Sequence, residues 1–512
     1  MVLVPLHPSA ARPAGMSAPS DAEPKAALVS APVITTTSSI DKPLINLLRG
    51  WPAPSILPVA QLNAATADVL ADQSVVVDSL QYGPDAGFQP LRESLASYLS
   101  QVFSAYDVPN DPNRICITGG ASQNAACILQ SFTDPAYTNC VWVSAPCYFL
   151  MCPIFEDSGF AGRLRAVPED DEGINVEALE RGFREFEPPA QPGTGGPYKT
   201  NLTPDRKAYR HVVYVVPTSS NPSGSSMSAK RREQLVRVAR KYDALLIADD
   251  VYDFLQWDVP RADAVLANKQ GSVALPPLLP RLVDVDRMLP RDDEDEETEK
   301  KYQGKQFGNA ISNASFSKIV APGFRTGWVE ATPAFAYGLA QTGSSKSGGA
   351  PSQFGAATIA VLMRTGELDR YLRETVRPTL QWRHRLLTQA VQEHLSEFLE
   401  IKCGGLPSGA SAEVTTYGGY FLWLKLRRTD ISAAAVSKLA LSVENLVIAD
   451  GKLFEVKGDE KSAQFDDHIR LCFAWEDEDK IVEGVQRLAR IFRDWDALQE
   501  KGLPSTGALE FK

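Results

Sequence analysis

The sequence predicts an α/β fold in which a mostly parallel β-sheet is covered by helices on both faces. The first observation is that short apolar runs alternate with helix-like segments through the middle third of the chain. The second is that these runs are unbroken, without the polar alternation of a strand that has one wet face, as expected for strands buried on both faces. This pattern is typical of parallel sheets whose crossover connections are helices.

Five strands and two helices are predicted in this region. The first strand, over 114–118, is followed by two glycines and then by a helix over 121–132. Ser228 is expected to cap a second helix that runs to about Tyr242, because a serine hydroxyl accepts from a free N–H group of the first helical turn. The remaining strands are expected over 140–144, 211–216, 244–248 and 310–314.

Composition favours a globular protein of a reducing compartment. The 512 residues carry 63 acidic and 52 basic side chains, and the net charge of −11 disfavours nucleic acid and membrane surfaces as partners. No apolar run approaches the roughly 18 residues of a membrane helix. The seven cysteines include no CxxC pair and mostly lie in apolar stretches, as buried free thiols would. We therefore expect a cytoplasmic protein, with a mitochondrial location less favoured.

Composition also assigns the segments outside the predicted sheet. Residues 1–38 are rich in Ala, Pro and Ser and are predicted to be a flexible tail. Stretches at about 188–210 and 290–306 are predicted to be inserted loops, the second with seven acids between Asp292 and Glu299. The histidines show no HxxxH or Cys/His pairing, so no metal site is expected.

Polar residues follow the predicted strands at their carboxyl ends, where open α/β sheets bind ligands. The helix that opens with Gly120, Ala121 and Ser122 offers free N–H groups, which suit a phosphate. Taken singly, each polar residue has an ordinary explanation as a turn, a helix cap or a solvated side chain. The residues that follow the later strands are Tyr148, Asn221, Asp249, Tyr252, Ser315, Lys318 and Arg325.

Together these residues meet the needs of pyridoxal 5′-phosphate (PLP). This cofactor needs a lysine amine for a Schiff base, an anion opposite its ring nitrogen, donors for its ring oxygen, a flat face for stacking and a cationic cup for its phosphate. Lys318 supplies the amine and Asp249 the anion. Asn221 and Tyr252 serve the ring oxygen, and Tyr148 supplies the flat face. The phosphate cup consists of residues 120–122, Ser315 and Arg325.

The chain resembles the fold-type I, class I and II PLP-dependent aminotransferases. Eight motifs occur in family order over about residues 45–490. Within the family the similarity is greatest to enzymes that act on aromatic amino acids, kynurenine and 2-aminoadipate. The motifs are QYGPDAG (81–87), LR (91–92), TGGAS (118–122), NPSG (221–224), ADDVY (248–252), SFSKIVAPGFRTGW (315–328), GGYFLW (418–423) and HIRLCF (468–473).

The resemblance implies two domains and a homodimer. A large domain over about 75–355 would hold the cofactor and a mostly parallel, seven-stranded sheet. A smaller α+β domain would combine about 39–74 with 356–512. Tyr82 would reach the phosphate bound by the neighbouring subunit, so the active sites would lie at the subunit interface.

The same resemblance implies transamination between an L-amino acid and a 2-oxo acid. Lys318 would form the Schiff base with PLP and then carry the proton, while Asp249 would pair with the ring nitrogen and Tyr252 would bind the ring oxygen. Arg470 would bind the substrate α-carboxylate through its bidentate fork, beside Asn221. The expected substrates are amino acids with an aromatic, 2-aminoadipate-like or other bulky side chain.

Several points stay open at the level of sequence. Ala121 stands where many relatives carry a hydroxyl group. Arg49 is either a surface arginine or a second cation for a distal substrate carboxylate, and Trp51 is either a core residue or a wall of the pocket. The cofactor residues would equally serve a β-lyase, a decarboxylase or a carbon–carbon bond-forming synthase, although Arg470 favours a substrate that keeps its carboxylate. A transcription regulator is disfavoured because residues 1–38 are too short for a winged helix.

Overall fold

The computed structural model describes residues 42–186, 199, 204–260, 268–291, 297, 299–402, 404–408 and 414–500. The predicted tail, Cys403, most of the predicted loop at 188–210, and residues 292–296 and 298 of the predicted loop at 290–306 lie outside the described residues. Among the helices that are described, none combines the length and the hydropathy that a membrane crossing requires. The six described cysteines are free and buried, as predicted.

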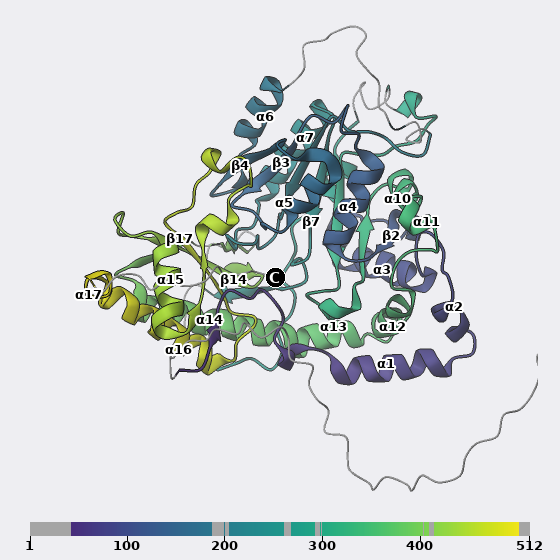
Figure 1. Ribbon diagram of the computed structural model, residues 1–512. Helices are drawn as coiled ribbons and strands as arrows, with labels where there is room; N and C mark the ends of the chain where they lie inside the picture. The colour runs from purple at the N-terminus through teal and green to yellow at the C-terminus, as the bar shows by residue number, and fades with distance from the viewer. Residues whose placement is uncertain are drawn as a thin grey trace, which may run out of the picture. The chain divides into compact units, whose positions relative to one another are not determined.

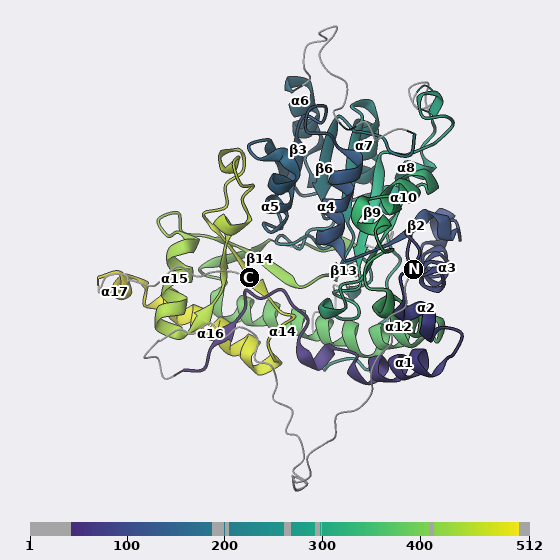
Figure 2. The ribbon, with the colours of Figure 1, turned by 45° about the vertical axis from the view of Figure 1, so that its right-hand side comes forward.

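The largest sheet of the described residues has eight strands, and it occupies the upper part of the views in Figures 1 and 2. Its strands, in spatial order, are β2 (Ile115–Thr118), β10 (Gly327–Glu330), β9 (Ala310–Ser315), β7 (Ala244–Asp249), β6 (His211–Val215), β3 (Val141–Ala145), β4 (Leu164–Asp170) and β5 (Gly173–Ile174). From β9 to β4 the strands run parallel, and β10 is antiparallel to both neighbours. The prediction of a mostly parallel sheet is confirmed. The sheet has one strand more than the seven predicted, because the two-residue strand β5 pairs with the end of β4.

Helices cover both faces of this sheet. One face is covered by α4 (Ala121–Phe132), α5 (Met151–Phe155) and α10 (Pro333–Ala340). The other face is covered by α6 (Val176–Glu185), α7 (Ala229–Lys241) and α8 (Leu282–Met288). Successive residues of one strand enter different cores: Tyr214 packs under the first set of helices and Val213 under the second. This double burial explains the unbroken apolar strands.

Smaller sheets and further helices complete the described chain. An antiparallel sheet has the order β11 (Leu399–Lys402), β14 (Phe421–Leu426), β17 (His468–Cys472) and β16 (Ala449–Asp450). Another joins β12 (Leu406–Pro407), β13 (Val414–Gly418) and β8 (Gln256–Pro260). Further helices are α1 (Val59–Ala71), α2 (Val76–Leu80), α3 (Gln89–Val102), α11 (Gly343–Lys346), α12 (Gln353–Arg364), α13 (Glu367–Tyr371), α14 (Arg377–Leu395), α15 (Ala433–Glu444), α16 (Glu478–Arg493) and α17 (Trp495–Glu500). The predicted domain boundaries stay a prediction.

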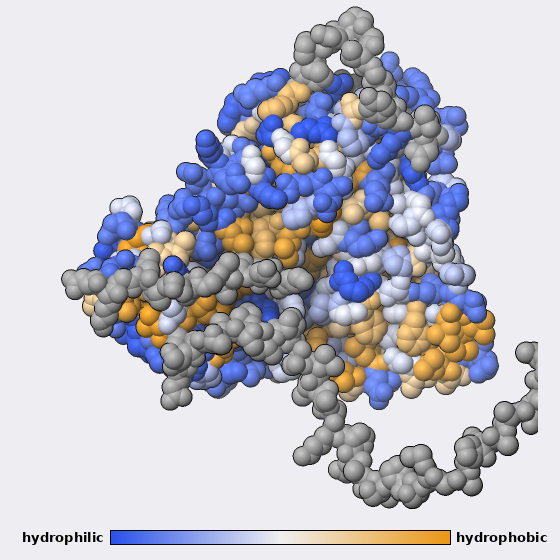
Figure 3. All heavy atoms as spheres, in the orientation of Figure 1, coloured by the Kyte–Doolittle hydropathy of each residue, from blue (hydrophilic) through white to orange (hydrophobic). Residues whose placement is uncertain are grey.

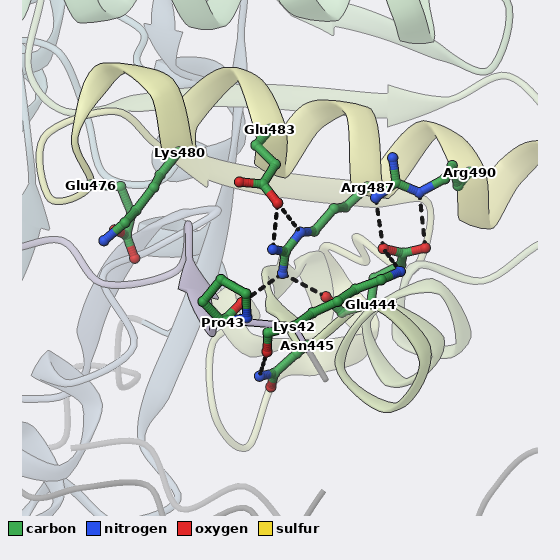
Figure 4. Close-up of polar contacts among 9 residues, drawn as sticks. All are labelled: Lys42, Pro43, Glu444, Asn445, Glu476, Lys480, Glu483, Arg487 and Arg490. Atoms are coloured by element: carbon green, nitrogen blue, oxygen red, sulfur yellow. Dashed lines mark hydrogen bonds and ion pairs between the residues drawn. The ribbon is translucent and has the colours of Figure 1, made fainter. Parts of the chain in front are cut away.

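The N-terminal strand β1 (Ile45–Asn46) is held against the C-terminal part of the chain. It pairs in parallel with β15 (Leu446–Val447). Pro43, which lies just before β1, is held by the buried Arg487 of α16. The Nη1 group of Arg487 donates to the backbone oxygens of Pro43 at 2.7 Å and of Glu444 at 2.8 Å (Figure 4). Because a buried guanidinium needs such acceptors, these bonds fix the chain immediately before the segment that reaches the candidate site.

Candidate active site

The strands of the large sheet bring the predicted polar residues to one edge. Asp249 at the end of β7 pairs in register with Asn313 of β9, and Val215 of β6 pairs with Ala248 of β7. Residues that follow the carboxyl ends of these parallel strands therefore lie side by side. They are Gly120, Ala121 and Ser122 after β2, Tyr148 after β3, Asn221 after β6, Tyr252 after β7, and Ser315 and Lys318 at and after β9.

The start of α4 forms a cup together with Ser315 and Arg325. Gly120 caps this helix with φ +94° and ψ 164°, a conformation essentially restricted to glycine. Arg325 donates from Nη2 to the backbone oxygen of Gly119 at 2.9 Å. A Cβ atom on Gly120 would lie 3.0 Å from this Nη2 and 3.5 Å from Oγ of Ser315. Helical N–H groups, a hydroxyl and a cation thus converge as a phosphate requires.

Lys318 lies where the large sheet meets the N-terminal segment. Its Nζ donates to the backbone oxygen of Gly50 at 2.6 Å and lies 5.0 Å from the centre of the Tyr420 ring. Burial lowers the pKa of Lys318 to about 8; the Arg470 cation acts in the same direction, and Asp249 opposes it. An amine with this pKa has a substantial neutral fraction near neutral pH, which a nucleophile or a base requires.

Asp249 is a buried carboxylate with one oxygen free. Its Oδ2 accepts from the hydroxyl of Tyr214 at 2.7 Å, whereas Oδ1 is buried without a hydrogen-bond partner among the described residues. Burial raises the pKa of Asp249 to about 6, while the Tyr214 hydrogen bond and the Lys318 charge lower it. A buried acceptor of this kind is costly unless a donor is supplied, so Oδ1 suits a protonated ring nitrogen.

The two predicted tyrosines, Tyr148 and Tyr252, interact electrostatically with the charged residues of the site. Burial raises the pKa of Tyr148, and the Asp249 charge raises it further, whereas Arg470 and Arg325 lower it. Tyr252 is buried, and its pKa is raised well above its ordinary value by burial and is influenced by the same Arg470 and Asp249. The structure therefore brings both aromatic side chains close to the predicted cofactor residues.

Arg470 is a buried cation on β17. It donates from Nη1 to Oδ1 of Asn221 at 2.6 Å and from Nη2 to the backbone oxygen of Leu48. Its guanidinium lies 4.1 Å from the centre of the Phe421 ring and 4.7 Å from that of Phe454. Burial lowers its pKa to about 10. Its Nε is buried without a hydrogen-bond partner among the described residues, so the fork retains a donor for a carboxylate.

Arg49 and Trp51 flank Gly50, whose oxygen accepts from Lys318. The Arg49 guanidinium lies 4.7 Å from the centre of the Trp51 ring and 4.8 Å from that of Trp475. The two indole rings meet edge-on with centroids 5.9 Å apart. Trp51 is 40% exposed, which disfavours the core alternative. The cluster presents two aromatic faces and a cation beside the lysine.

Tyr82 lies outside this group within its own chain. Its side chain is 88% exposed, and a Cβ atom added to Gly348 would lie 3.3 Å from its ring. Its predicted role across a dimer interface stays a prediction.

Four residues that were not predicted from the sequence also lie at the site: Gly50, Tyr214, Tyr420 and Trp475. Tyr214 could be suspected from sequence, because a tyrosine hydroxyl inside a buried strand needs a partner. Tyr420 lies within the GGYFLW motif, although the motif alone does not assign it a contact. For Gly50 and Trp475 no local signal exists, since their neighbours come from distant segments.

Comparisons with known proteins show which family and which proteins the chain resembles. Residues 61–488 match the family model described as aminotransferase class I and II. The Saccharomyces cerevisiae protein named Uncharacterized protein YER152C is 32% identical over 86% of this chain and 95% of its own length. Aromatic-amino-acid aminotransferase 1 of Thermococcus litoralis is 27% identical over 88% of both chains.

A solved structure extends the likeness to the fold. The Pyrococcus horikoshii kynurenine aminotransferase, in complex with PMP and kynurenine, matches with a TM-score of 0.65 and 25% identity over 88% of this chain and 91% of its own. The large sheet and the smaller antiparallel sheets therefore form a fold-type I aminotransferase structure. With the matched family model spanning most of the sequence, the chain belongs to the class I and II aminotransferases, a family of PLP-dependent enzymes.

Proposed function

We propose that this protein transfers an amino group between an L-amino acid with an aromatic, 2-aminoadipate-like or other bulky side chain and a 2-oxo acid, with PLP as its cofactor. One observation carries the proposal. The partly buried Lys318 amine, whose pKa is lowered to about 8, lies within the electrostatic reach of both the buried Asp249 carboxylate and the buried Arg470 cation. These are a nucleophile, an anion for the ring nitrogen and a cation for a carboxylate.

The described residues fit PLP. A Cβ atom on Gly120 would lie only 3.0 Å from Nη2 of Arg325, as expected for a cup in which backbone approaches a phosphate. Residues 121 and 122, Ser315 and Arg325 would hold that phosphate. Asp249 offers its unpartnered Oδ1 to the ring nitrogen. Asn221 and Tyr252 would bind the ring oxygen, and Tyr148 would stack on the ring.

The chain's own groups perform the remaining tasks. When bound, PLP supplies an aldehyde for the amines and an electron sink for negative charge at the substrate Cα. Lys318 would give up its bond to the Gly50 oxygen when a substrate binds, and its neutral Nζ would take the proton from the substrate Cα and hold it beside the cofactor site. Arg470 binds the α-carboxylate and thereby orients the Cα–H bond toward Lys318. Its buried setting strengthens this interaction.

The substrate class is proposed from the side chains around Gly50. Trp51 and Trp475 offer aromatic faces for a flat substrate side chain, and Arg49 offers a cation for a distal carboxylate. This combination supports aromatic and 2-aminoadipate-like substrates together. Two similar proteins, an aromatic-amino-acid aminotransferase and a kynurenine aminotransferase, are consistent with this choice.

The proposed assembly is a homodimer in which Tyr82 serves the neighbouring site. Figure 3 shows an apolar patch at the lower right, over α1 and α2. The exposed apolar side chains of this region are Val59, Leu70, Val77, Leu80 and Tyr82. A cluster of this kind is typical of an interaction surface, and sedimentation of the full chain tests the oligomeric state. The cytoplasmic location stays a prediction.

The test of the function follows the amino group. Purified PLP-loaded protein is incubated with one ¹⁵N-labelled amino acid at a time together with 2-oxoglutarate. Transamination predicts ¹⁵N-labelled glutamate and the 2-oxo acid of the donor in equal amounts. Release of ammonia, of CO₂ or of a product with a new carbon–carbon bond, without labelled glutamate, would instead identify a β-lyase, a decarboxylase or a synthase.

A further inference from the structure

We infer that Tyr214 is a positioning residue for the cofactor: it holds Oδ2 of Asp249 and leaves Oδ1 as the oxygen that meets the ring nitrogen of PLP. The inference rests on the proposed function, because it needs PLP to lie at this site. It assigns a role to a side chain near the end of β6, the strand next to the one that carries Asp249.

The geometry of the pair supports this division of labour. The Tyr214 hydroxyl and Oδ2 are 2.7 Å apart, and the two residues are at most 5% exposed. β6 and β7 are neighbouring parallel strands with Tyr214 paired to Ile247, so the backbone register fixes the approach of the hydroxyl to Asp249. Across the ring, Tyr214 packs edge-on against Phe155 with centroids 5.7 Å apart. The hydroxyl therefore has little freedom to leave the carboxylate.

The hydrogen bond from Tyr214 also favours the ionised form of Asp249. Burial raises the pKa of Asp249 to about 6, and the neighbouring Asp253 carboxylate acts in the same direction. The Tyr214 hydrogen bond and the Lys318 charge oppose this rise. Burial also raises the pKa of Tyr214 well above its ordinary value, so its hydroxyl keeps the proton and acts as the donor. Removing that donor would favour the neutral acid, which cannot pair with a protonated ring.

The second oxygen of Asp249, Oδ1, is left free for the cofactor. A carboxylate whose two oxygens were both free could rotate and present either one, at an entropic cost when the cofactor binds. With Oδ2 held by Tyr214, Oδ1 is the remaining acceptor, and it is buried without a partner among the described residues. Tyr214 thus prepares the carboxylate in the orientation and the charge state that the ring nitrogen requires.

The test compares two ligands on Tyr214→Phe in the full, cofactor-free chain. One ligand is PLP, and the other is its analogue with carbon in place of the ring nitrogen. The substitution removes one oxygen and keeps the ring. We expect the dissociation constant for PLP to rise about ten- to a hundredfold, as for a lost hydrogen bond to a charged group, and that for the analogue to change less than about twofold. An equal change for both ligands, or no change for either, would overturn the inference.

Two further variants make the outcome unambiguous. Tyr209→Phe removes the hydroxyl of another fully buried tyrosine, which donates to the backbone oxygen of Gly308 at 2.5 Å, and should leave both dissociation constants unchanged. Asp249→Asn should abolish the preference for PLP over the analogue. If Asp249→Asn keeps that preference, the proposed site itself is wrong. If Asp249→Asn abolishes it but Tyr214→Phe does not, only the role of Tyr214 is wrong.

Discussion

The two sides of the candidate site are built in different ways. The cofactor side, defined as residues 118–122, 148, 221, 249–252 and 315–325, follows the ends of strands in one sheet. The substrate side, defined as residues 48–51, 420–421 and 470–475, joins an N-terminal segment to β14 and β17 of another sheet. The groups for the cofactor therefore depend on turns at the ends of strands, whereas the groups for the substrate depend on contacts between distant segments.

The two sides also differ in how their polar atoms are satisfied. On the cofactor side, Oδ1 of Asp249 is buried without a partner among the described residues. On the substrate side, backbone oxygens of the N-terminal segment already accept from the functional cations: Leu48 from Arg470 and Gly50 from Lys318. The cofactor would therefore supply a donor that Asp249 lacks, whereas a substrate has to replace bonds to Leu48 and Gly50 as well as use the free Nε of Arg470.

The largest expected effect breaks the cofactor side at its nucleophile. Lys318→Ala removes the only amine that the proposal uses, and kcat for amino transfer should fall by about four orders of magnitude or more. Equilibrium dialysis should still detect PLP, because the cup and Asp249 are unchanged. Measured transfer of ¹⁵N to 2-oxoglutarate within about tenfold of the unmodified protein would show that another group performs the chemistry.

The next effect breaks the substrate side at its carboxylate-binding cation. Arg470→Lys keeps the charge but removes the fork that also binds Asn221 and Leu48. We expect KM for the amino acid and for the 2-oxo acid to rise about a hundredfold, with a smaller change in kcat. The affinity for PLP, measured on the same samples, should stay within about twofold. A loss of PLP affinity as large as the rise in KM would place Arg470 on the cofactor side instead.

Much of the cofactor side is predictable from sequence, because its residues come after the carboxyl ends of strands, most of which read as apolar runs. The helix predicted over 121–132 coincides with α4, and Ser228 caps α7 as expected, accepting from the backbone N–H of Arg231 at 3.1 Å. The substrate side is less accessible. Arg470 is identified only through family resemblance, and the contact of Trp475 with Arg49 follows from packing between segments that share no local pattern.

A smaller effect tests whether the phosphate cup is preformed. Gly120→Ala introduces a Cβ atom 3.0 Å from Nη2 of Arg325 at a φ of +94°. The backbone must relax or the arginine must move, so the dissociation constant for PLP should rise about tenfold. Gly366→Ala is the matched control, because its φ is +74° and its added Cβ meets nothing within 4 Å. Equal losses of affinity in both variants would point to general backbone strain rather than to the cup.

The smallest effect separates two contributions to the substrate side, the charge of Arg49 and the indole rings beside it. Arg49→Met keeps an unbranched side chain between Trp51 and Trp475 but removes the charge. Since a partly exposed cation contributes little, kcat/KM for 2-aminoadipate should fall only about three- to fivefold. The value for an aromatic amino acid should stay the same or rise, because the indole faces lose a competing cation. Trp51→Leu should have the opposite effect and lower kcat/KM more for the aromatic amino acid than for 2-aminoadipate. If Arg49→Met instead lowers kcat/KM equally for both substrates, Arg49 has only a packing role.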